Sequence, residues 1–258
     1  VEDLCGDPEA DLVVFLAGDQ FMVLPELVAG FRAAHPQVRS VFHETLLPGV
    51  LVEHFRCGGI RVGSLTLSVR PDVLALSPEA LASLHGQGLV GMPCSYARNA
   101  LALLVAPGNP VGIRGCADLA RPRVRVAFPD PRTEGIGRLA LTAAETAGGR
   151  ALRAELEGAK AATGELVYTT IHHRQGPACL AEGSTDVAVV WSTEVHQHLA
   201  AGTPVQVVTV PPEHHREGGY AAAAVNGAAH PEAAASFVAH LCGAAGRAVY
   251  AAYGFSPP

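Results

Sequence analysis

The sequence predicts an α/β fold in which buried strands alternate with helices, arranged as two lobes. Three observations predict it. Short apolar runs such as residues 11–16 are each followed by a turn and by a segment whose apolar residues recur at helical spacing. The strand-then-helix order recurs along the chain, which favours parallel strands joined by helical crossovers. The pattern then restarts after residue 100, which indicates a second lobe.

The first part of the chain contains three such pairs. A strand at 11–16 precedes a helix at 21–31, a strand at 37–44 precedes a helix at 50–57, and a strand at 71–76 precedes a helix at 78–84. In the second part we expect strands at 100–106, 113–119, 124–128, 167–171, 186–191 and 205–210, helices at 137–147 and 172–183, and two closing helices at 231–241 and 246–253.

Composition narrows the classes of function. The 258 residues are 49% hydrophobic and 16% charged, and the net charge is -6. Such a chain folds into a globular protein, and its acidic balance argues against a nucleic-acid partner. No apolar run reaches the length of a membrane span. Residues 1–5 lack the basic and apolar succession of an export signal, so we expect any such signal to be absent from this sequence.

The six cysteines form no C-x-x-C pair, which argues against a zinc ribbon or a thioredoxin-type site. Small buried hydrophobes and disulfide partners are both open interpretations for them. No G-x-S-x-G, H-E-x-x-H or P-loop motif occurs, so we expect no enzyme activity and no cofactor.

Several segments together resemble one family of proteins. They are Val14–Gln20 before the first helix, Asn99–Pro110, Ala117–Ala120, Asp130–Thr133, Leu180–Trp191, His230–Leu241 and Gly246–Phe255. Their order and spacing resemble the molybdate-type extracytoplasmic binding proteins, which have the type II periplasmic-binding fold. The resemblance covers nearly the whole chain.

This resemblance implies a domain organisation and a role. Residues 1–99 and 209–258 would form the first lobe and residues 100–208 the second, with a hinge at the crossing strands and a ligand cleft between the lobes. The protein would be the periplasmic or extracytoplasmic component of an ABC importer. We expect a monomer that binds one small molecule or ion and delivers it to a membrane permease. A sensing domain of a regulator, or an enzyme on the same fold, is the alternative.

The resemblance also implies which turns contact the ligand. The first comprises Asp19 and Gln20, where the family carries a serine. A carboxylate about 4 Å from an oxyanion would repel it by about 4 kcal/mol at an effective dielectric constant near 20. Alternatively, Asp19 caps the following helix. The second turn follows Glu44, which either faces the cleft or caps its strand. The third comprises Thr133, Glu134 and Gly135, where backbone N–H groups tolerate many side chains.

The fourth and fifth contact regions depart further from the family pattern. His172, His173 and Arg174 open a predicted helix and could form a cationic or metal-ligating cluster, unless one histidine is packed and the other solvated. Trp191 stands where the family has a tyrosine, so it offers only an indole donor and an apolar wall.

These departures lead to a hypothesis about the ligand. Molybdate or tungstate follows from the resemblance, whereas His172, His173, Asp19 and Glu44 could instead bind a transition metal or a metal complex. A second histidine pair, at residues 214–215, is expected in a solvated loop.

Overall fold

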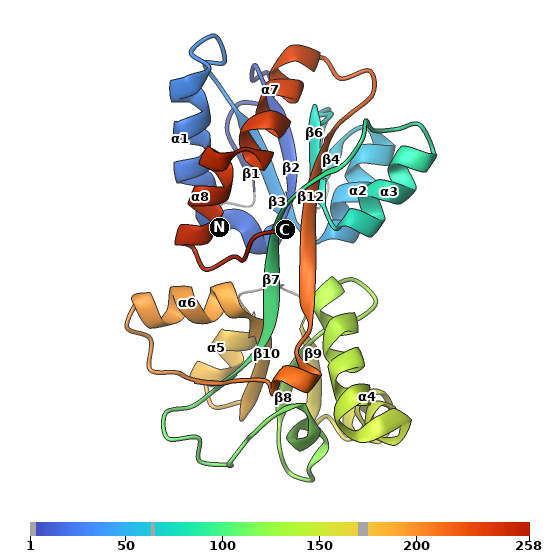
Figure 1. Ribbon diagram of the computed structural model, residues 1–258. Coiled ribbons are helices and arrows are strands. Elements are labelled where there is room, and N and C mark those ends of the chain that lie inside the picture. The colour runs from blue at the N-terminus through green and yellow to red at the C-terminus, as the bar shows by residue number, and fades with distance from the viewer. Residues whose placement is uncertain (1–3, 63–64, 170–174) are drawn as a thin grey trace. The chain divides into compact units, whose positions relative to one another are not determined.

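The computed structural model describes residues 4–62, 65–169 and 175–258. The chain forms two compact units, which are described separately (Figure 1). Unit 1 contains Val1–Arg98 together with Gly219–Pro258, and unit 2 contains Asn99–Gly218. The chain therefore passes between them within two long strands, β7 (Cys94–Val105) and β12 (Glu217–Ala224).

Unit 1 is a sheet with helices on both faces. Its strand order is β1-β3-β2-β6-β12, where β2 is parallel to β3 and β6 while β12 is antiparallel to β6. These strands are β1 Leu4–Cys5, β2 Val13–Ala17, β3 Phe42–Leu46 and β6 Val73–Leu76, and a separate hairpin is formed by β4 Ile60–Val62 and β5 Leu65–Leu67. Every side chain of β2 is buried, as expected for a strand covered on both faces.

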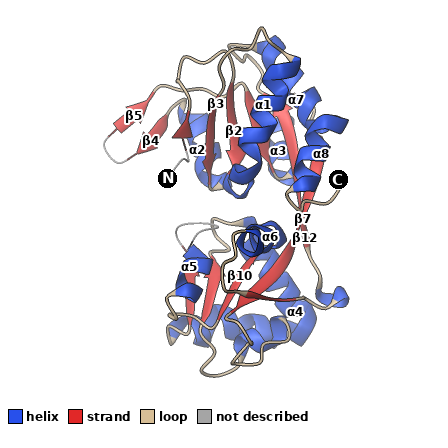
Figure 2. Ribbon diagram, turned by 90° about the vertical axis from the view of Figure 1, so that its left-hand side faces the viewer, coloured by secondary structure: helices blue, strands red, loops and turns tan. Residues whose placement is uncertain are grey.

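The helices of unit 1 cover these two faces (Figure 2). One face packs against α1 (Leu24–Ala34), α7 (Pro231–Cys242) and α8 (Ala244–Ala252) through a cluster that includes Phe31 and Phe237. The opposite face packs against α2 (Pro48–Cys57) and α3 (Pro78–Gly86) through a cluster that includes Phe15 and Leu51. A 3₁₀ helix, η1 (Gly18–Val23), joins β2 to α1.

Unit 2 repeats this layered design. Its strand order is β7-β10-β8-β9, with β11 also paired to β7. The strands are β8 Val126–Pro129, β9 Leu166–Thr169, β10 Val187–Trp191 and β11 Gln206–Val208, and the helices are α4 Gly135–Glu155, α5 Gln175–Ala181 and α6 Ser192–Ala200. Short helical turns lie at η2 Cys116–Ala120, η3 Leu156–Lys160 and η4 Pro212–His214. Helix α4 packs on one face of the sheet and α5 with α6 on the other.

The predicted α/β fold class is confirmed, but several boundaries differ. The strand predicted at 37–44 begins only at Phe42, because the Asp11 carboxylate accepts hydrogen bonds from the backbone N–H groups of Arg39 and Ser40 and so holds that segment outside the sheet. The helix predicted at 137–147 extends to Glu155, with non-helical backbone at Gly148 and Gly149.

The second crossing strand was not predicted at its true position. The strand at 206–208 pairs with β7 inside unit 2, and the crossing strand is β12 at 217–224. The β12 sequence is rich in alanine and glycine, so it lacks the alternation of apolar and polar residues that identifies a strand. In the second histidine pair, His214 is the last residue of η4 and His215 follows it, so the pair lies just before β12.

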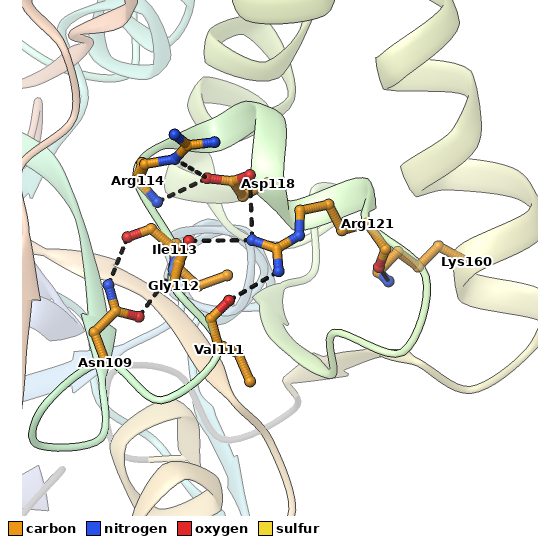
Figure 3. A network of polar contacts seen from close by, with 8 residues as sticks. All are labelled: Asn109, Val111, Gly112, Ile113, Arg114, Asp118, Arg121 and Lys160. Carbon is orange, nitrogen blue, oxygen red and sulfur yellow. Dashed lines mark hydrogen bonds and ion pairs between the residues drawn. The ribbon is translucent and has the colours of Figure 1, made fainter.

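The loop after β7 is fixed by polar contacts (Figure 3). The Asn109 side chain donates to the carbonyl of Ile113 and accepts from its N–H. Arg121 donates to two carbonyls of the same loop, and its own carbonyl accepts a 2.6 Å hydrogen bond from Nζ of Lys160. Lys160 is the only lysine in the sequence, and its side chain is buried, with Glu165 as its ion-pair partner. The buried ammonium group of Lys160, the last residue of η3, therefore links η3 to this loop.

No helix among the described residues is both long and apolar enough to cross a lipid bilayer.

Candidate functional site

In unit 2 the carboxyl ends of three parallel strands meet at one edge of the sheet. Pro129 at the end of β8 pairs with Thr169 at the end of β9, and β10 runs parallel to β8 beside it, ending at Trp191. The predicted residues Thr133, Glu134 and Gly135 follow β8. Since ligands of open α/β sheets bind outside the carboxyl ends of the strands, this edge is the candidate site of unit 2.

The turn between β8 and α4 is held by the Asp130 carboxylate. It accepts from the backbone N–H of Arg132 and forms an ion pair of 2.6 Å with the Arg132 guanidinium, which lowers the pKa of the Asp130 carboxyl. The Asp130 carbonyl also accepts from the N–H groups of Thr133 and Glu134. A Cβ on Gly137 would lie 2.3 Å from the carbonyl oxygen of Pro129, so only glycine allows α4 to begin this close to the strand end.

Glu134 is the residue immediately before α4, and it is 8% exposed. Its Oε1 accepts a 3.2 Å hydrogen bond from the Thr169 hydroxyl at the end of β9. Thr169 was not among the site residues predicted from the sequence, although a threonine near a strand end, three residues before His172, was the available signal. Thr133 is exposed and Gly135 is half-buried, so the first turn of α4 presents backbone N–H groups at this edge.

Trp191 ends β10 and immediately precedes α6. Its backbone N–H donates a 2.6 Å hydrogen bond to the Glu194 carboxylate, which completes one half of a capping box. Trp191 as a whole is 9% exposed. A Cβ on Gly218 would lie 2.6 Å from Cη2 of Trp191, so the ring depends on a glycine from β12 for its position.

The start of α6 is further fixed by Asn99, which was not predicted as a site residue. Asn99 in β7 is 1% exposed, its Nδ2 donates to the Thr193 hydroxyl at 2.8 Å, and its Oδ1 accepts from the Ser192 hydroxyl at 2.9 Å. The amino end of α6 therefore has a defined position beside the end of β10.

In unit 1, Asp19 and Gln20 lie in η1, directly after the carboxyl end of β2. Ala17 is the residue that precedes this helix, so the alternative interpretation of Asp19 as a helix cap is not what the structure shows. Gln20 is fully buried, and its Oε1 accepts hydrogen bonds from the hydroxyls of Tyr96 and Tyr250. Burial raises the pKa of both tyrosines, which keeps their hydroxyls protonated as donors.

Asp19 is half-buried and accepts a hydrogen bond from the hydroxyl of Tyr220 in β12. The three tyrosines around η1 come from β7, β12 and α8, remote from Asp19 in the sequence. No local motif could have identified them.

Glu44 is the third residue of β3 and is fully buried. Its Oε1 lies 2.6 Å from Nδ1 of His54 in α2, which is itself 5% exposed. Burial raises the pKa of the Glu44 carboxyl, and the hydrogen bond with His54 offsets part of that rise. Its Oε2 has no hydrogen-bond partner among the described residues. The carboxylate is thus directed toward α2, inside unit 1.

His172, His173 and Arg174 lie outside the described residues, so their predicted role stays a prediction. Within residues 4–62, 65–169 and 175–258, no group of three or more His, Cys, Asp or Glu side chains is arranged to hold a metal ion. Of the four predicted metal ligands, the two that the structure describes have separate partners: Asp19 bonds to Tyr220 and Glu44 to His54.

Comparison with known proteins gives the family context. Residues 12–256 match the family described as bacterial extracellular solute-binding protein. The molybdate-binding protein ModA of Mycobacterium tuberculosis (strain ATCC 25618 / H37Rv) is 29% identical over 233 residues, covering 89% of this chain and 82% of that protein. The resemblance found in the sequence is therefore confirmed.

Solved structures show the same fold. The sulfate-binding protein SubI from Mycobacterium tuberculosis H37Rv aligns with a TM-score of 0.73 at 24% identity, over 95% of this chain and 85% of that one. The Azotobacter vinelandii periplasmic molybdate-binding protein aligns with a TM-score of 0.75 at 20% identity, over 96% and 99%. A periplasmic thiamin binding protein aligns with a TM-score of 0.75 at 16% identity, over 95% and 82%. The predicted type II periplasmic-binding fold is confirmed.

Proposed function

Because the chain belongs to the bacterial extracellular solute-binding protein family, we propose that it is the periplasmic or extracytoplasmic ligand-binding component of an ABC importer. It would act as a monomer that binds one small ligand, leaves it chemically unchanged and delivers it to a membrane permease. The observation that carries this proposal is the match over residues 12–256, together with the 29% identity to a molybdate-binding protein.

The proposed ligand is an oxyanion of the molybdate or tungstate type. The partners of the carboxylates support it. Glu134 accepts from the hydroxyl of Thr169, and Glu194 accepts from the backbone of Trp191. Glu44 bonds to His54 inside unit 1. Each of these carboxylates has a hydrogen-bond partner within its own unit, which compensates part of its negative charge and so reduces its repulsion of an anion.

Backbone donors would supply the attraction for this ligand. The helices α4 and α6 both begin at the carboxyl edge of the unit 2 sheet, and the first N–H groups of a helix attract anions together with the helix dipole. We propose that the turn at Asp19 and Gln20 in unit 1 also contacts the ligand when the protein closes on it. Small-angle scattering should then show compaction when ligand is added.

A divalent transition metal is the second candidate ligand. It is favoured by Asp19, which stands where the molybdate-type family carries a serine, and by the neighbouring histidines His172 and His173 in the sequence. The two candidates differ in the sign of the ligand charge, so a substitution at Asp19 separates them.

Isothermal titration of the native protein and of Asp19→Ser with molybdate, tungstate, sulfate and Zn²⁺ tests the proposal. For an oxyanion ligand, Asp19→Ser removes a repelling charge and should strengthen molybdate binding about tenfold, or about 1.4 kcal/mol. For a metal ligand, the same substitution should weaken Zn²⁺ binding. The absence of binding to all four ions would contradict both candidates. Recovery of the bound oxyanion unchanged after prolonged incubation tests the carrier role.

A further inference from the structure

Two of the six cysteines lie against each other in unit 1. Cys94 is the first residue of β7 and Cys242 is the last residue of α7. Sγ of Cys242 lies 3.3 Å from the carbonyl oxygen of Cys94, and both side chains are half-buried. Burial, followed by the contact with Cys94, raises the pKa of the Cys242 thiol. The 3.3 Å contact places the two cysteines side by side in unit 1.

The other cysteines are placed differently. Cys5 and Cys57 are exposed, while Cys116 is buried in the core of unit 2 and Cys179 is half-buried in α5. Among the residues that the structure describes, none of these four thiols hydrogen-bonds to another cysteine. The sequence contains no motif that distinguishes Cys94 and Cys242 from the rest.

We propose that Cys94 and Cys242 form a disulfide bond in the exported protein. The inference rests on the proposed extracytoplasmic location, because disulfides persist in oxidising compartments and are rare in the reducing cytosol. The bond requires the two thiols to turn toward each other until the sulfur atoms are about 2.05 Å apart.

The chemistry is thiol-disulfide exchange with a disulfide oxidant. One cysteine thiolate attacks the oxidant's disulfide, forming a mixed disulfide and releasing one thiol of the oxidant. The second cysteine then attacks the mixed disulfide, which forms the Cys94–Cys242 bond and releases the other thiol. The protein loses two electrons and two protons, and the oxidant is reduced to two thiols.

This cross-link would join the two chain segments that build unit 1. Cys94 belongs to the segment Val1–Arg98 and Cys242 to the segment Gly219–Pro258, and they are 148 positions apart in the sequence. The closed loop contains all of unit 2. Because a disulfide that closes a long loop strongly reduces the freedom of the unfolded chain, the bond should fasten α7 and α8 to the rest of unit 1.

The test is peptide mapping of the purified full chain after incubation with oxidised glutathione, compared with the fully reduced chain. We expect the number of titratable thiols, measured under denaturing conditions, to fall from six by about two. Mass spectrometry should find one cross-linked peptide pair containing Cys94 and Cys242. The oxidised protein should melt roughly 5 to 15 °C above the reduced protein.

Three single variants provide the comparison. Cys94→Ser and Cys242→Ser should each lose the cross-linked peptide and the rise in melting temperature, whereas Cys57→Ser, at an exposed position, should keep both. Retention of all six thiols in the native chain, or a cross-link between other cysteines, would overturn the proposal. The wild-type peptide map alone decides this if a serine variant fails to fold. Because the map needs no ligand, its outcome is independent of the titrations that test the proposed function.

Discussion

The hydroxyl of Tyr220 in β12 donates a hydrogen bond to the carboxylate of Asp19 in η1, although the two residues are 201 positions apart in the sequence. Asp19 comes from the first segment of unit 1 and Tyr220 from the second. A hydrogen-bond donor that contacts an ionised carboxylate compensates part of the carboxylate's negative charge. Tyr220 therefore adjusts the electrostatics of a turn that departs from the molybdate-type pattern, where Asp19 replaces a serine.

Tyr220→Phe should weaken oxyanion binding. The substitution removes the donor and leaves the charge of Asp19 less compensated, so we expect the dissociation constant for molybdate to rise about threefold to tenfold. Isothermal titration measures it. The control is a double-mutant cycle with Asp19→Ser, because without the carboxylate the loss of the Tyr220 hydroxyl should have little effect. An equal effect in both backgrounds would contradict a role through Asp19.

Glu44→Gln should flatten the dependence of stability on pH. Burial raises the pKa of Glu44 above its ordinary value of 4.5, so the folded chain holds this proton more tightly than the unfolded chain. The resulting stabilisation is present at low pH and is lost as pH rises through the raised pKa. The variant stays neutral and should lack this loss. Urea unfolding across a pH series measures it, with the exposed Glu232→Gln as control. Parallel curves for native and Glu44→Gln proteins would rule out this contribution.

Gly218→Ala should displace the indole of Trp191. The added methyl would lie 2.6 Å from Cη2, so the ring or the β12 backbone must shift, at a cost of roughly 1–3 kcal/mol. Trp191 is the only tryptophan, so its fluorescence emission and near-ultraviolet circular dichroism report the change directly. Gly158→Ala is the matched control, because no atom lies within 4 Å of its added methyl. Identical spectra for native and Gly218→Ala proteins would show that the indole accommodates the methyl.

Asp72→Asn should destabilise unit 1 by about 2–4 kcal/mol. The Asp72 carboxylate is 1% exposed, accepts from the N–H groups of Val13 and His230 at 2.9 Å, and lies 3.0 Å from Nδ1 of His230. An amide supplies only one acceptor oxygen, so its NH₂ group would face one of these N–H donors. Chemical denaturation gives the difference. Asp7→Asn, exposed on a loop, should change stability by less than about 0.5 kcal/mol. A similarly small effect at Asp72 would mean that the chain relaxes around the amide.

Sequence patterns located most elements because apolar periodicity and turn residues are local properties. The strand 71–76 and the helix 78–84 were predicted nearly at their observed bounds, since a buried apolar run is followed by Ser77, whose hydroxyl caps the helix. The β12 strand was missed because its alanines become a core strand only through pairing with β6. Among the predicted residues of unit 2 that the structure describes, Glu134 and Trp191 lie at the same edge of the sheet, because both stand where a parallel strand ends.

By itself the sequence determined the α/β class, the alternation of strands and helices in most of the chain, and the family, because these depend on local patterns and on their spacing along the chain. Only the tertiary structure decided the partners of the charged and reactive side chains: Glu44 with His54, Asp19 with Tyr220, and Cys94 beside Cys242. Burial and hydrogen bonding depend on which strands become neighbours. Which strands become neighbours is decided by the packing of the whole sheet, so these partners cannot be identified from any single segment of the sequence.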